Sequence, residues 1–247
     1  MYNLLIALAA GVAIAVGIAL FGFPLWAGIV PGTIVFVGAY IFLARRIATR
    51  VGALSQSAQK ELSSPPANAR EQKVKVEKAI RTLEEGLVYD RWQFLVAAEI
   101  HAQIGMIKYM MKDLQGAEAH LAKANPRNYM AKAIQAALFF QKKEFGRMRE
   151  SFEAAVRSGK KEGLVWAAYA WCLLQLKEKD EAQKVLARAV QTNPTDDKLK
   201  NALTSVQNDK RLKMKAWEPQ WWQFGLEQPP APVMGGGGGR RVQYVRR

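Results

Sequence analysis

The chain has 247 residues and a formal net charge of +15, and it contains a single cysteine, Cys172. One cysteine excludes an intrachain disulfide and a metal cluster held by several thiolates. The basic excess flanks the central part: residues 45–70 have five basic and one acidic residue, residues 71–209 have 23 and 18, and residues 210–247 have eight and two. Because anionic lipid attracts basic segments beside a membrane, this distribution favours a membrane surface over nucleic acid as the electrostatic partner.

Residues 1–44 predict a transmembrane helical hairpin, because they contain no Asp, Glu, Lys, Arg or His. A hydrocarbon core about 30 Å thick needs roughly 20 apolar residues of helix, so this stretch is long enough for two crossings. Phe21-Gly22-Phe23-Pro24 interrupts it. We expect one span over about Tyr2–Leu20 and a return span over about Leu25–Ala44, with Trp26 at the membrane–water interface.

Two alternatives for this segment are a cleavable signal peptide and a buried helical pair of a soluble domain. The first would need a basic leading region, and none precedes Leu4. The second is disfavoured because helices that are apolar all round are unusual in small domains. Arg45, Arg46 and Arg50 directly follow the second span and predict an inner (plasma) membrane protein with both termini and the remaining chain cytoplasmic.

Small residues recur at intervals of four within the predicted hairpin, as in Gly28 and Gly32 of the second span. This spacing lets two helix backbones approach closely in lipid, although a composition rich in Ala and Gly explains it equally well. Pro31 lies inside the second span and is expected to kink it.

Residues 45–70 predict a juxtamembrane amphipathic helix, which extends the second span, followed by a Pro/Ser linker. The apolar residues recur at helical spacing and suggest a helix on or near the membrane surface: Ile47, Val51, Leu54, Ala58 and Leu62. Ser63 to Asn68 then form a stiff polar linker.

Residues 71–209 predict a helical domain, since the apolar periodicity is helical and no strand pattern occurs. Within 163–196 small and large residues follow the order Trp166, Ala170, Ala182, Leu186, Ala189 and Pro194. This segment resembles a tetratricopeptide repeat, a 34-residue helix–turn–helix unit with small residues where its helices touch. One period earlier the register returns at Ala136, Phe139, Met148, Phe152 and Ala155, and weaker copies precede it at Gly105, Ala117, Leu121 and Ala124, and at Ala79, Leu83 and Gly86.

The resemblance implies an all-α fold: the hairpin followed by an α-solenoid of about three such units, closed by a capping helix over 197–209. An ordinary bundle of helical hairpins is the alternative. The resemblance also implies a concave partner-binding surface, to which we assign Met106, Tyr109, Met110, Met130, Phe140, Leu164, Trp171 and Leu174. Several of these residues could instead pack against neighbouring repeats. Family members that hold the carboxylate tails of chaperones use Lys, Arg and Asn there, whereas Ala102, Ala133, Ala137 and Ala167 stand at the corresponding positions here.

The C-terminal tail, residues 210–247, is basic and then rich in Trp, Pro and Gly. Trp217, Trp221 and Trp222 have three possible sites: the helical domain, the bilayer interface or a partner. Residues 229–239 predict a flexible linker, and residues 240–247 form a basic peptide suited to anionic lipid, an acidic protein or RNA.

No catalytic or cofactor-binding pattern is found, so we expect a protein that is not an enzyme and holds no cofactor or metal. His101 and His120 lack metal-ligand spacing, and Cys172 lies among apolar neighbours. The leading hypothesis is a membrane-anchored scaffold or adaptor that recruits unidentified protein partners at the cytoplasmic face. The alternative is a membrane-tethered protein that binds nucleic acid or an acidic partner through its basic tail.

Overall fold

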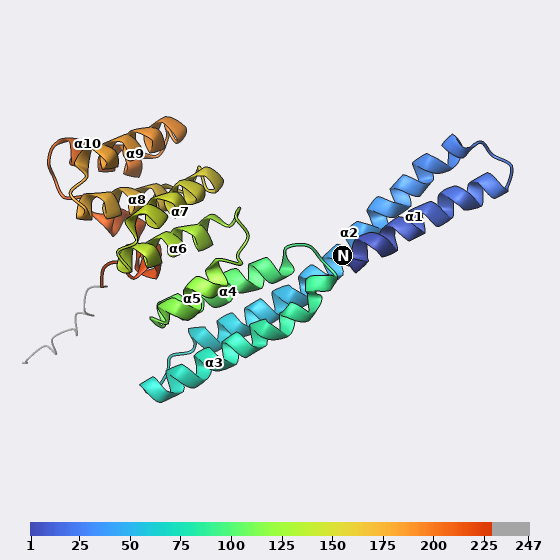
Figure 1. Cartoon of the computed structure of the whole chain (residues 1–247), viewed down its shortest axis with the longest axis horizontal. Coiled ribbons are helices and arrows are strands. Elements are labelled where there is room, and N and C mark those ends of the chain that lie inside the picture. Colours follow the sequence, from blue (N-terminus) through green and yellow to red (C-terminus); the bar gives the residue numbers. More distant parts are fainter. Residues whose placement is uncertain (229–247) are drawn as a thin grey trace, which may run out of the picture.

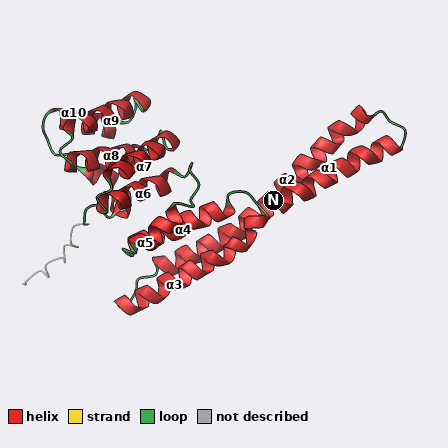
Figure 2. Cartoon of the chain, in the orientation of Figure 1, coloured by secondary structure: helices red, strands yellow, loops and turns green. Residues whose placement is uncertain are grey.

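The computed structural model describes residues 1–228, leaving aside the side chain of Leu25. This part of the chain is built from helices and loops without a strand, which confirms the all-α prediction (Figures 1 and 2). In chain order the elements are α1 (Tyr2–Leu20), α2 (Leu25–Ser63), α3 (Ala69–Glu85), η1 (Gly86–Arg91), α4 (Val96–Met110), α5 (Leu114–Leu121), α6 (Tyr129–Gln141), α7 (Phe145–Ser158), α8 (Gly163–Gln175), α9 (Lys179–Thr192), α10 (Asp197–Gln207), η2 (Met214–Trp217) and η3 (Gln220–Phe224).

Helices α1 and α2 form an antiparallel hairpin at one end of the molecule (Figure 1). Both are long and apolar enough to cross a membrane. Their backbones touch at the small residues: a Cβ atom on Gly28 would lie 2.6 Å from the carbonyl oxygen of Ala15, and one on Gly32 would lie 2.7 Å from that of Gly11. Glycine is therefore required at this contact, so of the two explanations left open for the spacing the structure supports close backbone packing.

Helix α2 continues without a break from the apolar span to Ser63, as expected for an amphipathic extension of that span. What differs from the prediction is its surroundings, because its second half packs against α3 (Figure 1). Ile47 and Ala58 are only 6% and 2% exposed, and they share a core with Leu83 of α3 and Ile104 of α4. The apolar stripe thus faces the helical domain rather than a membrane surface, because α3 and α4 cover it.

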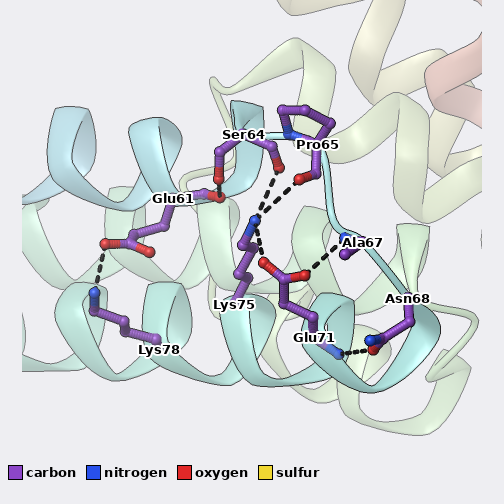
Figure 3. A network of polar contacts seen from close by, with 8 residues as sticks. All are labelled: Glu61, Ser64, Pro65, Ala67, Asn68, Glu71, Lys75 and Lys78. Atoms are coloured by element: carbon purple, nitrogen blue, oxygen red, sulfur yellow. Dashed lines mark hydrogen bonds and ion pairs between the residues drawn. The ribbon is translucent and has the colours of Figure 1, made fainter.

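The turn between α2 and α3 is held by polar contacts (Figure 3). The Asn68 side chain accepts a hydrogen bond from the Glu71 amide at 2.8 Å, and the Glu71 carboxylate accepts one from the Ala67 amide at 2.7 Å. The pair resembles a capping box, except that Glu71 bonds the amide one residue before the N-cap Asn68, and it fixes where α3 begins. Lys75 pairs with Glu71 at 2.8 Å and donates to the Pro65 carbonyl at 3.2 Å. The turn therefore folds α3 back along α2.

Beyond α3, three helical pairs follow one another: α4 with α5, α6 with α7, and α8 with α9, and α10 packs on the last pair. Each pair contacts the next. The positions of the repeated pattern are buried as the resemblance implies: Ala117, Leu121, Ala136, Phe139, Met148, Phe152, Ala155, Ala170, Ala182, Leu186 and Ala189. Helix α4 joins two cores, with Ile100 and Ile104 facing α2 and α3 and with Ala102 and Tyr109 facing the later pairs. The elements therefore pack in chain order: α1 on the first half of α2, the second half of α2 on α3, and then the three helical pairs.

Candidate functional site: a cleft beside the C-terminal segment

The turns inside the three helical pairs share one conformation. Lys112, Lys143 and Lys177 each end the first helix of a pair with a left-handed backbone, at φ of 62°, 62° and 63°. The following amide donates to a carbonyl five residues earlier, for example from Glu144 to Phe139 at 2.9 Å. This is the hydrogen bond of a Schellman ending, where glycine is the usual residue. Each of these lysines is exposed at the turn between the two helices of its pair, a position called the corner below.

The carboxylates beside these lysines are already paired within the domain. Asp113 lies 3.1 Å from Lys108, and Glu144 lies 2.9 Å from Lys142. A hydrogen bond from the Gly116 amide and then one from Lys108 lower the pKa of Asp113, and the hydrogen bond from Lys142 lowers the pKa of Glu144. Both carboxylates are neutralised locally, so Lys112 and Lys143 leave the corner positive.

The C-terminal segment, residues 210–228, docks on the helical domain. Its η3 helix contacts α6 and α8, the first helices of two successive pairs. Trp221 is 1% exposed and Phe224 is fully buried. The Trp221 ring meets Trp171 edge-on, with 5.4 Å between the ring centroids. Of the three possible sites for the tryptophans, the structure therefore selects the domain itself.

Tyr109 and Gln141 tie this segment to the first two pairs. The buried Tyr109 hydroxyl donates to the Phe224 carbonyl and accepts from Nε2 of Gln141 at 2.8 Å. The same amide nitrogen donates to the Gly225 carbonyl at 3.2 Å. Burial raises the pKa of Tyr109, so its phenol stays protonated and able to donate.

An open cleft of about 660 Å³ lies between the corners of the pairs and the C-terminal segment. Its floor and walls are mostly apolar, and two exposed lysines stand at its rim. The lining residues are Tyr109, Met110, Lys112, Leu114, Phe140, Gln141, Lys143, Phe145, Leu176, Trp222, Gln223, Gly225 and Leu226. The arrangement can hold an apolar side chain with acidic groups beside it.

The predicted partner-binding residues fall into three groups. Tyr109, Met110 and Phe140 line this cleft, and Met110 is 65% exposed. Trp171 is buried under Trp221, and with Leu174 it lines a smaller hollow of about 450 Å³ beside residues 209–212. Met106, Met130 and Leu164 are partly buried against the core. The chain's own C-terminal segment thus covers part of the surface that the resemblance assigned to partners.

The sequence does not predict that Trp222 and Leu226 line the cleft, because it indicates only where the tail as a whole could bind. Three aromatic residues within 221–224 were a usable signal, since buried aromatic rings need a surface to cover them. The predicted linker over 229–239 and the basic peptide over 240–247 lie outside the described residues.

His101 and His120 meet although they are far apart in sequence. Their Nδ1 atoms lie 3.1 Å apart, across the contact between α4 and α5. Desolvation by burial is the main reason that the pKa of each imidazole is lowered. Within residues 1–228 no third metal-binding side chain joins them, and the lowered pKa values favour neutral rings. Burial likewise raises the pKa of the Cys172 thiol, which keeps it protonated.

The residues predicted at the membrane interface lie toward opposite ends of the apolar segment. Trp26 is 73% exposed beside the turn of the hairpin. Arg45, Arg46 and Arg50 are exposed on α2, where the hairpin gives way to the helical domain. Their separation along α2 is about 28 Å at 1.5 Å per residue, close to the thickness of a hydrocarbon core.

The family model described as tetratricopeptide repeat matches residues 140–206, which extend from Phe140 in α6 to Val206 in α10. A comparison with curated proteins found no match. The match includes the segment whose pattern was the clearest in the sequence, and repeats of this kind serve as scaffolds for protein–protein interaction. Residues 140–206 therefore match a tetratricopeptide repeat, and the described part of the chain around them consists of helices and loops.

Proposed function

We propose that this protein is a scaffold anchored in the inner (plasma) membrane, whose tetratricopeptide region binds a partner protein at the cytoplasmic face. The single observation that carries the binding role is the open, apolar, lysine-rimmed cleft, which the matched repeat region forms together with residues 109–114 and the C-terminal segment. The proposed role is binding without catalysis, and it involves no cofactor.

The exposed apolar surface of the hairpin supports the anchor. The most apolar windows of α1 and α2 have mean hydropathies of 2.4 and 2.0, yet only 17% and 11% of their residues are buried. A core helix of a soluble protein would have its apolar side chains covered by other elements. An apolar helix surface that is exposed to this extent is suited to lipid rather than water. The proposed cytoplasmic orientation follows from Arg45, Arg46 and Arg50, which directly follow the second span.

The chemistry of the cleft supports a partner segment with an apolar anchor flanked by acidic residues. Met110 and Phe145 offer an adaptable apolar wall, and methionine suits binding surfaces because it is flexible and polarisable. Lys112 and Lys143 are free to pair with acidic groups, because the neighbouring Asp113 and Glu144 are already neutralised. A rim of this sign steers an acidic partner more than it adds affinity.

Photo-crosslinking tests the binding site. A photoreactive residue at Met110 should form a specific adduct in intact cells, whereas the same residue at Val74 of α3, which is 58% exposed and lines none of the clefts described, should not. Adding Lys112→Glu and Lys143→Glu should abolish the Met110 adduct. Equal adduct yields at Met110 and Val74 would contradict the proposed binding site. An unchanged Met110 adduct after both lysines are replaced by glutamate would contradict it as well.

Extraction and proteolysis test the anchor and its orientation. The full chain should stay in membranes at alkaline pH, and protease should reach residues 64–228 only after the cells are opened. Release by alkali contradicts the anchor, and digestion in intact cells contradicts the cytoplasmic orientation.

A further inference from the structure

The connection between α3 and α4, residues 86–95, lies against the end of the hairpin where the chain begins (Figure 1). The Asn3 amide donates to the Trp92 carbonyl at 3.3 Å, and the Asn3 side chain donates to Gln93 at 3.1 Å. Gln93 in turn donates to the Tyr40 hydroxyl at 3.3 Å, and the rings of Tyr2 and Trp92 meet edge-on at 5.4 Å. Both helices of the hairpin therefore hold this connection in place.

These contacts fix the depth of the connection relative to the hairpin. Tyr40 precedes Arg45 by about 7.5 Å of helix rise, on the side that leads into the apolar span. Asn3 lies at the same level, because Gln93 bridges its side chain to that of Tyr40. The connection is thus tied to the apolar side of the arginines, at the level where a span leaves the hydrocarbon core.

The connection exposes large apolar side chains at this level. Val88 is 71% exposed, Leu95 is 58%, Phe94 is 49% and Trp92 is 39%. Leu95 has a left-handed backbone with φ of 66°, which is uncommon for a residue with a large side chain. An exposed Trp and Phe beside an exposed Arg91 are the residue types that gather in the head-group layer of a bilayer.

We propose that the α3–α4 connection is a third membrane contact, in which Val88, Trp92, Phe94 and Leu95 enter the interface of the bilayer that holds the hairpin. This inference rests on the proposed anchor. Continuity with the hairpin selects lipid as the occupant, since the four side chains flank a backbone already tied to Asn3 and Tyr40. A contact on both α2 and the α3–α4 connection holds the helical domain at one height and tilt above the membrane.

Site-directed fluorescence with quencher lipids tests this proposal on the full chain. With the buried Cys172 replaced by alanine, single cysteines at Phe94, Val88, Val37 or Val74 carry an environment-sensitive dye. The protein is reconstituted in phosphatidylcholine–phosphatidylglycerol vesicles with spin-labelled lipid. Val37 is 45% exposed on the span and reports insertion of the hairpin, whereas Val74 is 58% exposed on α3 and serves as the aqueous control.

Dyes at positions 94 and 88 should show blue-shifted emission and lose more intensity to a shallow quencher than to a deep one. The dye at 37 should show the reverse preference, and the dye at 74 should lose none. If 37 is quenched while 94 and 88 behave like 74, the third contact is refuted and the anchor stands. If 37 is not quenched, both the anchor and this contact are refuted. Shielding of 94 and 88 from water without quenching by lipid indicates a protein partner instead and also overturns the proposal.

Discussion

At the scale of single residues, lysines occupy corner positions where the backbone favours glycine. Lys143 has a φ of 62°, while its neighbour Lys142 has an ordinary helical φ of −77°. A left-handed conformation costs a residue with a Cβ atom about 1–2 kcal/mol. Two of the three corner lysines, Lys112 and Lys143, line the cleft, which indicates a use for their charge there.

Lys143→Gly should raise the free energy of unfolding by roughly 0.5–1 kcal/mol, because relief of the left-handed strain exceeds the added freedom of glycine in the unfolded chain. Lys143→Ala removes the same charge without relieving the backbone and serves as the control. Thermal unfolding of the detergent-solubilised protein measures both. Equal stabilisation by alanine would show that charge, not conformation, sets the effect.

The His101–His120 contact predicts a dependence of stability on pH. Desolvation lowers the pKa of both imidazoles in the folded state, so the unfolded chain binds protons more readily below the ordinary pKa of roughly 6.5. Their contribution is present above that pH and is lost as the pH falls toward the folded pKa values. Replacing both histidines with glutamine should reduce the difference in urea midpoint between about pH 7.5 and pH 5.5. An unchanged difference would assign the pH dependence to other groups.

At the scale of elements, the hairpin depends on backbone contact between α1 and α2. Gly28→Leu should force the helices apart, because a Cβ atom there would lie 2.6 Å from the Ala15 carbonyl oxygen. Gly38→Leu is the matched control, since a Cβ atom at Gly38 meets no atom within 4 Å. Spin labels at Ile6 and Val37 should report a longer distance only in the first variant. A shift of equal size in both variants would contradict this close packing.

The C-terminal segment is the second element whose position can be tested. Trp221→Ala should cost about 3–5 kcal/mol, because it removes a ring buried against Trp171 and leaves a cavity. Trp222→Ala should cost clearly less, since Trp222 is half-buried and lines the open cleft. Chemical unfolding compares the two. Equal losses would indicate that the segment does not dock through Trp221.

At the scale of the whole molecule, α2 belongs to both the span and the helical domain. The boundary predicted near residue 70 separates α3 from the half of α2 that covers Ala79 and Leu83. A fragment of residues 45–228 should therefore unfold cooperatively, with a midpoint temperature well above that of a fragment of residues 71–228. The shorter fragment should lose several kcal/mol of unfolding free energy, at about 1.5–3 kcal/mol for each large apolar side chain that is no longer buried. Equal stability of the two fragments would restore the boundary near residue 70.

The sequence alone was sufficient for features that depend on local pattern. A charge-free run from Met1 to Ala44 predicts two apolar helices, and the spacing from Trp166 to Ala189 predicts a tetratricopeptide unit. Both predictions agree with the helices found and with the family match over 140–206. They succeed because helical periodicity and the length of a span follow from backbone geometry, whatever the rest of the chain does.

Only the tertiary structure decided what covers each apolar face. A stripe such as Ile47 to Ala58 requires burial, but its residues do not say whether lipid or another helix supplies it. The docking of Trp221 on Trp171 and the contact of Trp92 with Tyr2 likewise join positions far apart in the chain. Which helix faces contact one another is decided only when all helices pack together. The periodicity of apolar residues along the chain does not specify these contacts.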